Sequence, residues 1–338
     1  MNTSNRQWLL HRRPQGMATA DDFEYRETEI STTPELAPGE LLLRNRVFLC
    51  APTMRNFMNP PGNSFYLSLP IGEPVFAPAG CEVIASARPG VPVGALVTAF
   101  TSWQDYQRVG SAHALTPLPA GVDLMQAMGT LGMNTQTAYF GLLRVGRPLP
   151  GETVVVSGAA GSTGSIAAQI GKIQGCRVIG IAGGAEKCKW LINALKLDGA
   201  LDYKAGDVLG QLRHLCPNGI DVFYDNVGGE ILQAAVEVMA RKGRIVLCGQ
   251  IAGYNDADPA PGLRNMMRLV YGSITVQGFL RSDYADEVPA ALAELQSWFA
   301  AGKLQARVDA RGGFMQIPQT FAALFRGENA GTLLALVD

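Results

Sequence analysis

Two patterns of apolar residues divide the chain. In residues 6–122, short apolar runs at 40–47, 80–84 and 95–100 are bounded by proline and glycine, which is typical of β-strands separated by turns. Further along, apolar runs alternate with helical stretches, and they predict strands at residues 153–157, 177–181, 201–203, 221–225, 244–248 and 274–279. This alternation indicates βαβ units and a doubly wound parallel sheet, so the predicted fold class is α/β with a β-rich N-terminal region.

The remaining segments carry their own signals. Residues 123–145 are expected to be helical, and the sequence Pro-Leu-Pro-Gly at 148–151 separates them from the first parallel strand. From about residue 304, the pattern predicts a short strand, a helix at 318–325 and a last strand at 332–337. At about 100 to 200 residues per domain, a chain of 338 residues is long enough for two domains, each with its own core.

Composition excludes several classes of function. The chain has 28 basic and 29 acidic side chains, so no basic field is present to hold a nucleic acid. Six scattered cysteines without a Cys-x-x-Cys pair are typical of reduced thiols in the cytosol. The first residues lack the apolar core of a signal peptide, and no uncharged apolar run approaches the roughly 18 residues of a membrane span. We therefore expect a soluble, cytoplasmic protein that binds neither nucleic acid nor membrane.

A glycine-rich loop occurs where a strand would meet a helix. The segment Gly158-Ala-Ala-Gly161-Ser-Thr-Gly164 follows the apolar run at 153–157 and precedes an expected helix at 165–174. Glycine lets the backbone turn sharply and approach a pyrophosphate, which the N–H groups and dipole of the helix N-terminus then stabilise. The loop indicates a dinucleotide site. The alternative is a tight turn needed only for packing of the helix on the sheet.

The residues after the second strand distinguish the two nicotinamide cofactors. An NAD site usually has a carboxylate about 20 residues beyond the loop, which accepts a hydrogen bond from the ribose 2′-OH, but this chain has Ala182-Gly183-Gly184 there. Lys187 and Lys189 follow, and Tyr203-Lys204 ends the third strand; cations and a phenol suit a 2′-phosphate. The sequence therefore favours NADPH. The alternative is that Lys187 is a solvated helix residue and Glu186 binds a 2′-OH.

Other catalytic chemistries lack their residues. The histidines, at positions 11, 113 and 214, form no zinc-ligand pattern with any cysteine, and Cys50 is better explained as a buried thiol without a role. The Tyr-x-x-x-Lys pair of short-chain dehydrogenases and the Gly-x-Ser-x-Gly nucleophile elbow are absent. No metal is expected, and zinc-dependent alcohol oxidation is disfavoured.

Several segments taken together resemble one family. They are residues 102–106 (Ser-Trp-Gln-Asp-Tyr), 131–133 (Leu-Gly-Met), 137–143 (Thr-Ala-Tyr-Phe-Gly-Leu-Leu), 182–188 (Ala-Gly-Gly-Ala-Glu-Lys-Cys), 225–229 (Asp-Asn-Val-Gly-Gly), 248–251 (Cys-Gly-Gln-Ile), 254–255 (Tyr-Asn) and 327–329 (Gly-Glu-Asn). The set resembles the zinc-independent medium-chain dehydrogenase/reductases, in the branch of prostaglandin reductase, leukotriene dehydrogenase, the alkenal double-bond reductases and curcumin reductase. The resemblance covers nearly the whole chain. It implies a GroES-like β-rich catalytic domain of residues 1–122 and 304–338 and a Rossmann domain of residues 123–303.

The resemblance also implies cofactor-binding positions. They comprise the phosphate loop, the lysine and tyrosine at the 2′-phosphate, the segment lining the cofactor and the residues that flank the nicotinamide. In this chain these are Asn134, Gly161, Ser162, Thr163, Gly164, Gly184, Lys187, Tyr203, Asn226, Cys248, Gly249, Gln250, Ile251, Tyr254, Phe279, Leu280 and Asn329.

The family resemblance further implies a reaction. Its members reduce the carbon–carbon double bond of α,β-unsaturated carbonyls, so we expect NADPH-dependent hydride transfer to the β-carbon of a small apolar enone or enal, and Tyr254 matches a tyrosine near the substrate carbonyl. The ordinary pKa of a phenol is about 10, so Tyr254 would be a neutral donor at pH 7, able to polarise the carbonyl and help to protonate the enolate. The alternative is that Tyr254 anchors its loop or packs against the cofactor.

Departures from the family pattern leave the substrate open. Relatives commonly have Asp-Pro-Tyr-Met-Arg where this chain has Ala-Pro-Thr-Met-Arg at 51–55, proline in place of Asn134, and lysine in place of Thr332. Loop aromatics and methionines often line apolar pockets, and core packing is the alternative for such residues. The predicted residues of the substrate mouth are Tyr66, Thr53, Met54 and Met133.

Two other functions and one assembly complete the expectations. A quinone reductase of the same superfamily and a non-catalytic NADPH-binding protein remain alternatives, which a screen of enones and quinones with NADPH would separate. Residues 271–279 are expected to form the edge strand of the parallel sheet. An exposed apolar edge favours pairing between subunits, so a homodimer is predicted.

Overall fold

The chain folds into two compact units. The computed structural model describes residues 2–62, 67–119, 121–256 and 262–338. One unit comprises Met1–Thr130 with Val308–Asp338, and the other comprises Leu131–Arg307. The boundaries differ from the predicted 122/123 and 303/304. Met128 is buried against Val47 and Leu334 of the first unit, whereas Leu304 packs in the core of the second, so these side chains assign their segments to the opposite units from those predicted.

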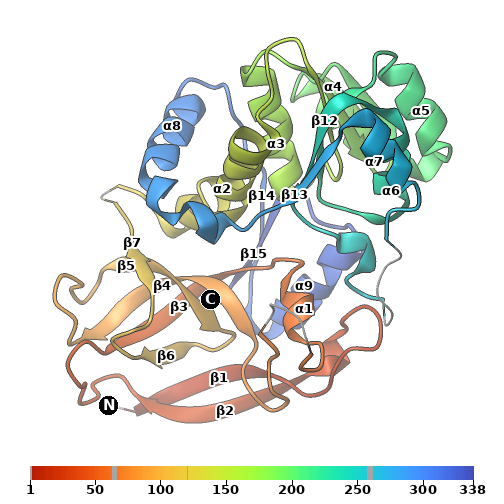
Figure 1. Cartoon of the computed structure of the whole chain (residues 1–338). Helices are drawn as coiled ribbons and strands as arrows, with labels where there is room; N and C mark the ends of the chain where they lie inside the picture. Colours follow the sequence, from red (N-terminus) through yellow and green to blue (C-terminus); the bar gives the residue numbers. More distant parts are fainter. Residues whose placement is uncertain (1, 63–66, 120, 257–261) are drawn as a thin grey trace. The chain divides into compact units, whose positions relative to one another are not determined.

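The first unit is rich in β-structure (Figure 1). Its elements are β1 (Asn2–Leu10), β2 (Phe23–Ser31), β3 (Leu41–Leu49), α1 (Met54–Phe57), β4 (Phe76–Ser86), β5 (Leu96–Ser102), β6 (Tyr106–Val109), β7 (Leu115–Pro117), β14 (Val308–Arg311), α9 (Ile317–Phe325) and β15 (Thr332–Leu336). Strands β1 and β2 form an antiparallel pair, while the larger sheet has the order β14-β15-β3-β4-β5-β7, with β6 paired along β3. The predicted runs at 40–47, 80–84 and 95–100 overlap β3, β4 and β5.

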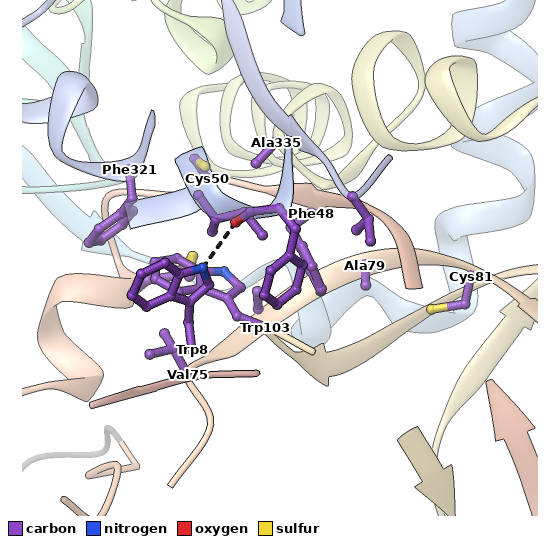
Figure 2. Close-up of a cluster of buried hydrophobic side chains, with 14 of the residues drawn as sticks. Trp8, Phe48, Cys50, Val75, Ala79, Cys81, Trp103, Phe321 and Ala335 are labelled. Atoms are coloured by element: carbon purple, nitrogen blue, oxygen red, sulfur yellow. Dashed lines mark hydrogen bonds between the residues drawn. The ribbon is translucent and has the colours of Figure 1, made fainter. Parts of the chain in front are cut away.

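The two ends of the chain meet in the core of this unit. Figure 2 shows Trp8, Trp103 and Phe321 packed together, and the indole N–H of Trp8 donates a hydrogen bond to the carbonyl of Phe314 at 2.9 Å. The Trp103 ring lies 5.6 Å from that of Phe321 and 5.2 Å from that of Phe23. Aromatic pairs at such distances contribute beyond their buried area. These contacts explain why residues 308–338 fold with the N-terminal unit.

The second unit is a parallel sheet covered by helices. Its elements are α2 (Met133–Phe140), β8 (Thr153–Val156), α3 (Ser162–Ile173), β9 (Arg177–Ala182), α4 (Ala185–Asn193), β10 (Gly199–Asp202), α5 (Val208–Leu215), β11 (Ile220–Asp225), α6 (Gly229–Val238), β12 (Met239–Leu247), α7 (Met266–Gly272), β13 (Thr275–Gly278) and α8 (Val288–Ala300). The strand order is β10-β9-β8-β11-β12-β13 and every pair is parallel. The predicted α/β class, with a β-rich domain and a doubly wound Rossmann sheet, is confirmed.

Alternate residues of the central strands explain why both faces of this sheet are covered. Val154 and Val156 of β8 pack with α2, α3 and α8 on one face. Val155 packs with α5 and α6 on the other. Because successive side chains of a strand point to opposite faces, a continuous apolar run such as residues 153–156 fits a strand that is buried on both sides.

Two predicted elements differ from those observed. The expected helix at 123–145 is divided into a π-helical turn (Gln126–Thr130), α2 and a second π-helical turn (Gly141–Gly146), because Gly132 is extended and begins α2 afresh. The predicted edge strand starting at residue 271 is also wrong in its first part, since Tyr271 lies in α7 and β13 begins at Thr275. Short apolar runs do not distinguish strand from helix. No helix in the described part of the chain is long and apolar enough to cross a bilayer.

Candidate functional site: a dinucleotide-binding end of the parallel sheet

The glycine loop joins β8 to α3 by a close backbone approach. Gly158 has φ +59°, and the N–H of Gly161 donates to its carbonyl at 2.9 Å. A Cβ on Gly164 would lie 2.3 Å from the Gly158 oxygen, so only glycine fits at the start of the helix. The N-cap residue of α3 is Gly161, and no side chain caps the helix. Backbone N–H groups at such an uncapped N-terminus suit a phosphate.

Two lysines, one after β9 and one after β10, lie near each other. Lys187 belongs to the first turn of α4 and is half-buried. Burial lowers the pKa of its ammonium, and the nearby charge of Lys204 lowers it further. A cation that is desolvated and faces another cation gains most from a bound anion. This arrangement suits a 2′-phosphate.

The carboxylates near these lysines are already engaged. Asp202 accepts hydrogen bonds from the backbone N–H groups of Gly184 at 2.8 Å and Lys204 at 3.0 Å. Glu186 is exposed and pairs with Lys189 at 2.8 Å. Asp202 therefore orients the backbone at residues 184 and 204, whereas Glu186 is an exposed side chain in a surface ion pair.

Tyr203 packs directly against Gly183. A Cβ at residue 183 would lie 2.8 Å from the Tyr203 ring and 2.9 Å from its hydroxyl. The small residue in place of an acid therefore also makes room for the phenol. The sequence predicted that Tyr203 ends the third strand, but β10 ends at Asp202 and Tyr203 follows it.

A buried carboxylate fixes the carboxyl ends of β8 and β11. Asp225 accepts hydrogen bonds from the Ser157 hydroxyl at 2.6 Å and from the N–H groups of Val227 and Gly228 at 3.0 and 3.1 Å. Burial raises the pKa of Asp225, while these hydrogen bonds oppose the shift. Asn226 donates from its side chain to the Ser157 carbonyl at 2.7 Å. The predicted cofactor residue Asn226 thus lies directly beside the glycine loop.

Sequence reasoning assigned no role to Asp225 or Asp202. Asp225 precedes Asn226 in the Asp-Asn-Val-Gly-Gly segment, so an acid directly after the apolar run Val-Phe-Tyr was the available signal. Nothing in the sequence shows that Asp202, 18 residues from Gly184, bonds to its N–H. Both carboxylates hold backbone loops, which makes them positioning residues.

The segment after β12 lies at the same carboxyl ends of the strands. The N–H groups of Cys248 and Gly249 donate to the Asp225 carbonyl at 2.8 and 3.1 Å. The side chain of Gln250 lies against Gly228, where an added Cβ would meet it at 2.5 Å. The N–H of Ile251 donates to the Asn226 carbonyl at 3.4 Å. The structure therefore brings these predicted cofactor residues together with the loop at 225–229.

Tyr254 is turned back onto its own loop. Its hydroxyl oxygen accepts a hydrogen bond from the N–H of Gln250 at 3.2 Å, and a Cβ on Gly249 would lie 3.3 Å from that oxygen. The phenol oxygen is therefore held near the backbone of the cofactor segment. This geometry suits both a loop anchor and a donor near the end of the cofactor.

Asn134 connects another helix to the phosphate loop. Its side-chain amide donates to the hydroxyl of Ser162, the first residue of α3, at 2.9 Å. Met133 begins α2 and is partly exposed. Phe279 packs so closely on Gly141 that a Cβ there would lie 2.4 Å from the ring, while Leu280 is largely exposed. These residues belong to the same unit as the loop.

The predicted residues of the β-rich unit have different environments. Thr53 is exposed and precedes α1. Met54 is 1% exposed and packs in the core of its unit, which favours the core-packing alternative over a place in the substrate mouth. Asn329 donates from its side chain to the Gly331 carbonyl at 2.9 Å. Tyr66 lies outside the described residues.

The described residues around this arrangement offer no metal site. Among the residues that the structure describes, no group of three or more His, Cys, Asp or Glu side chains could hold a metal ion. Cys50, the thiol considered at the sequence level, is buried, and burial raises its pKa to about 12. A thiol in that state is a poor metal ligand, since the thiolate is the ligating form.

Known proteins match both units. A family model described as the N-terminal domain of oxidoreductase matches residues 6–118, and one described as zinc-binding dehydrogenase matches residues 162–297. The NADPH-dependent curcumin reductase of Escherichia coli is 35% identical and the match covers 98% of this chain and 97% of that protein. Prostaglandin reductase 1 of Mus musculus is 35% identical, with 96% of each chain covered. The crystal structure of CurA in complex with NADPH from Vibrio vulnificus has 36% identity, a TM-score of 0.92 and coverage of 98% and 99%. The chain therefore belongs to the medium-chain dehydrogenase/reductase family, in its zinc-independent branch.

Proposed function

We propose that the protein is an NADPH-dependent reductase of carbon–carbon double bonds conjugated to a ketone or aldehyde. The observation that supports this cofactor is the pair of Lys187, after β9, and Lys204, after β10, while Asp202 accepts from backbone and Glu186 pairs with Lys189. A structure of CurA, a protein with the same fold, contains NADPH. The reaction rests on the relatives named curcumin reductase and prostaglandin reductase.

The residues of the site fit this reaction. When bound, NADPH supplies the hydride for the β-carbon of the substrate. The N–H groups at the start of α3 and the ammonium of Lys187 would hold the phosphate groups and so fix the position of the cofactor. The product of hydride addition is an enolate, whose oxygen needs a hydrogen-bond donor and whose α-carbon then takes a proton from water or an acid.

Tyr254 is the proposed donor to that oxygen. Its own oxygen accepts from the N–H of Gln250, and a hydroxyl that accepts a hydrogen bond is polarised and becomes a stronger donor. The Tyr254→Phe variant is expected to lower kcat by about 10 to 100-fold and to change the Kd of NADPH by less than about two-fold. Stopped-flow kinetics and fluorescence titration measure the two quantities.

A matched control separates this role from a structural one. Tyr284→Phe removes a hydroxyl from a ring of the same unit that stacks on Phe140, outside the cofactor segment and the proposed dimer surface, and should leave both quantities unchanged. An unaltered kcat for Tyr254→Phe would remove the phenol from the reaction. A rise in the Kd of NADPH with kcat retained would identify a loop anchor.

A substrate screen decides between the proposed function and its alternatives. NADPH and NADH consumption would be followed with enals, cyclic enones, aryl enones and quinones. We expect turnover of enones or enals with NADPH. Turnover of quinones alone would identify a quinone reductase, and NADPH binding without turnover of any acceptor would indicate a non-catalytic protein.

We also propose that the protein is a homodimer. Strand β13 ends the sheet, and α7, which precedes it, exposes Met266, Met267, Val270 and Tyr271. Val270 is 64% and Tyr271 78% exposed. Adjacent apolar side chains next to an unpaired strand edge favour pairing with a second copy.

Light scattering after size exclusion tests this assembly. We expect a mass of about twice 36.0 kDa for the wild-type chain and a monomer for Val270→Glu combined with Tyr271→Glu, since buried carboxylates are costly at an interface. Leu149→Glu, at a position that is 62% exposed in the same unit, should remain dimeric. A monomeric wild-type protein would contradict the proposal.

A further inference from the structure

A cavity in the Leu131–Arg307 unit lies away from the glycine loops. It has a volume of about 410 Å³ and is lined by the connection from α5 to β11, the end of α6 with the start of β12, and α7. Its lining includes Gly219, just before β11, and Met239, the first residue of β12. The cavity is therefore at the amino ends of two parallel strands.

This position separates the cavity from the cofactor site. The glycine loop and Asn226 follow the carboxyl ends of β8 and β11. Strand β11 has six residues, which at about 3.3 Å per residue span about 20 Å. The two sites thus lie at opposite ends of the parallel strands. The proposed function uses no residue that lines the cavity.

The lining of the cavity is dominated by positive charge. Arg213, Arg241 and Arg268 line it together with one carboxylate, Glu237. Glu237 accepts a hydrogen bond from the side chain of Asn265 at 2.9 Å. In the described part of the chain, none of the three arginines forms an ion pair. Three guanidinium groups around one cavity leave a local excess of cationic charge.

The environments of Arg268 and Cys216 in the lining also suit an anion. The Arg268 side chain is fixed by a hydrogen bond from its Nη2 to the Met239 carbonyl at 2.8 Å, while its buried Nε has no acceptor among the described residues. A desolvated and unpaired guanidinium N–H is unfavourable, and a neighbouring anion offsets that cost. Burial raises the pKa of Cys216 to about 11. The thiol in the lining is therefore neutral at pH 7 and does not repel an anion.

We propose that this cavity binds a phosphate or pyrophosphate group, free or carried by a nucleotide. Guanidinium groups present a planar fork that matches phosphate oxygens in a bidentate manner. Three arginines supply more donors than one monoanion needs, so a multiply charged phosphate is favoured. The volume is sufficient for such a group with water or with part of a larger ligand.

Calorimetric titration with inorganic pyrophosphate tests the site. The protein would be saturated with NADPH, so that the phosphate positions of the cofactor site are filled. We expect binding to the wild-type protein and at least about a ten-fold loss of affinity for Arg213→Gln combined with Arg241→Gln. Neither side chain makes a hydrogen bond with another described residue, so this variant should fold, which its urea unfolding midpoint would verify.

A control variant removes the same charge outside the cavity. Lys242→Gln combined with Lys303→Gln changes two lysines of the same unit that do not line the cavity, and its affinity should stay within about two-fold of the wild-type value. Absence of binding to the NADPH-saturated protein would overturn the proposal. An equal loss of pyrophosphate affinity in the arginine and the lysine double variants would also overturn it, because that result would show general attraction by net charge.

A parallel titration with ADP identifies the source of the phosphate. Equal affinities for ADP and pyrophosphate would show that the phosphate groups alone are recognised. Tighter binding of ADP that is lost in the Arg213→Gln and Arg241→Gln variant would show that a nucleoside occupies the rest of the cavity. Both results support an anion site at this edge of the sheet.

Discussion

Gly164→Ala is expected to raise the Kd of NADPH by about 100-fold or more. The added Cβ would lie 2.3 Å from the Gly158 oxygen and 2.8 Å from its carbonyl carbon. Both contacts are with backbone, so relief requires the loop to move away from the N-terminus of α3. That movement displaces the N–H groups that would hold the pyrophosphate. Fluorescence titration of NADPH measures the change.

Gly161→Ala provides a graded comparison for this prediction. Gly161 has φ −82°, which alanine adopts readily, and its Cβ would lie 3.2 Å from the same Gly158 oxygen. We expect an increase in Kd of only a few-fold, and a cooperative urea unfolding transition of each variant would show that both remain folded. If Gly164→Ala binds NADPH as tightly as Gly161→Ala does, the close approach is not required for the cofactor.

Lys187→Gln is expected to weaken NADPH binding by about 10 to 50-fold while leaving the Kd of NADH nearly unchanged. The ammonium of Lys187 is half-buried, and burial together with Lys204 lowers its pKa in the ligand-free chain. A 2′-phosphate removes this unfavourable state by pairing with both cations. NADH lacks that phosphate and gains nothing from them. The ratio of the two dissociation constants is the measurement.

Lys189→Gln is the control on the same helix. Lys189 is exposed and pairs with Glu186, so removing its charge should change neither constant by more than about two-fold. Losses of equal size for NADPH and NADH in Lys187→Gln would mean that the lysine supports the fold of α4 rather than the 2′-phosphate. A preference for NADH in the wild-type chain would contradict the proposed cofactor directly.

Local patterns in the sequence were sufficient for the scaffold of the cofactor unit. The apolar run at 153–157 corresponds to β8, and the strands predicted at 177–181 and 221–225 correspond to β9 and β11. A strand that is buried on both faces has to be apolar throughout, so its sequence is distinctive. The glycine loop was equally clear, because a turn from strand to helix with close backbone approach restricts the residue type at fixed spacing.

Some elements have a local pattern that fits more than one structure, and only the tertiary structure identifies them. The edge strand was predicted from residue 271, but Tyr271 belongs to α7. The signal that favours helix is Asn265, whose side chain accepts from the N–H of Arg268 as an N-cap. Met54 resembled a cleft residue by its type and its position in a family motif, yet it is buried in the core. A side chain's partners depend on the packing of distant segments, which no local pattern contains.

The pattern of residues was sufficient for the fold class, the family and the replacement of a ribose-binding acid by Gly183-Gly184 beside Lys187. Which groups meet at the carboxyl ends of the strands became known only from the folded chain. Asp225 accepts a hydrogen bond from the hydroxyl of Ser157, which is 68 residues away in the sequence. Asp202 accepts one from the N–H of Gly184, which is 18 residues away. The fold likewise brings Arg213, Arg241 and Arg268 to one cavity. Periodicity and turn residues act over a few neighbours in the chain, whereas hydrogen bonds and electrostatic fields depend on distances that the folded backbone sets.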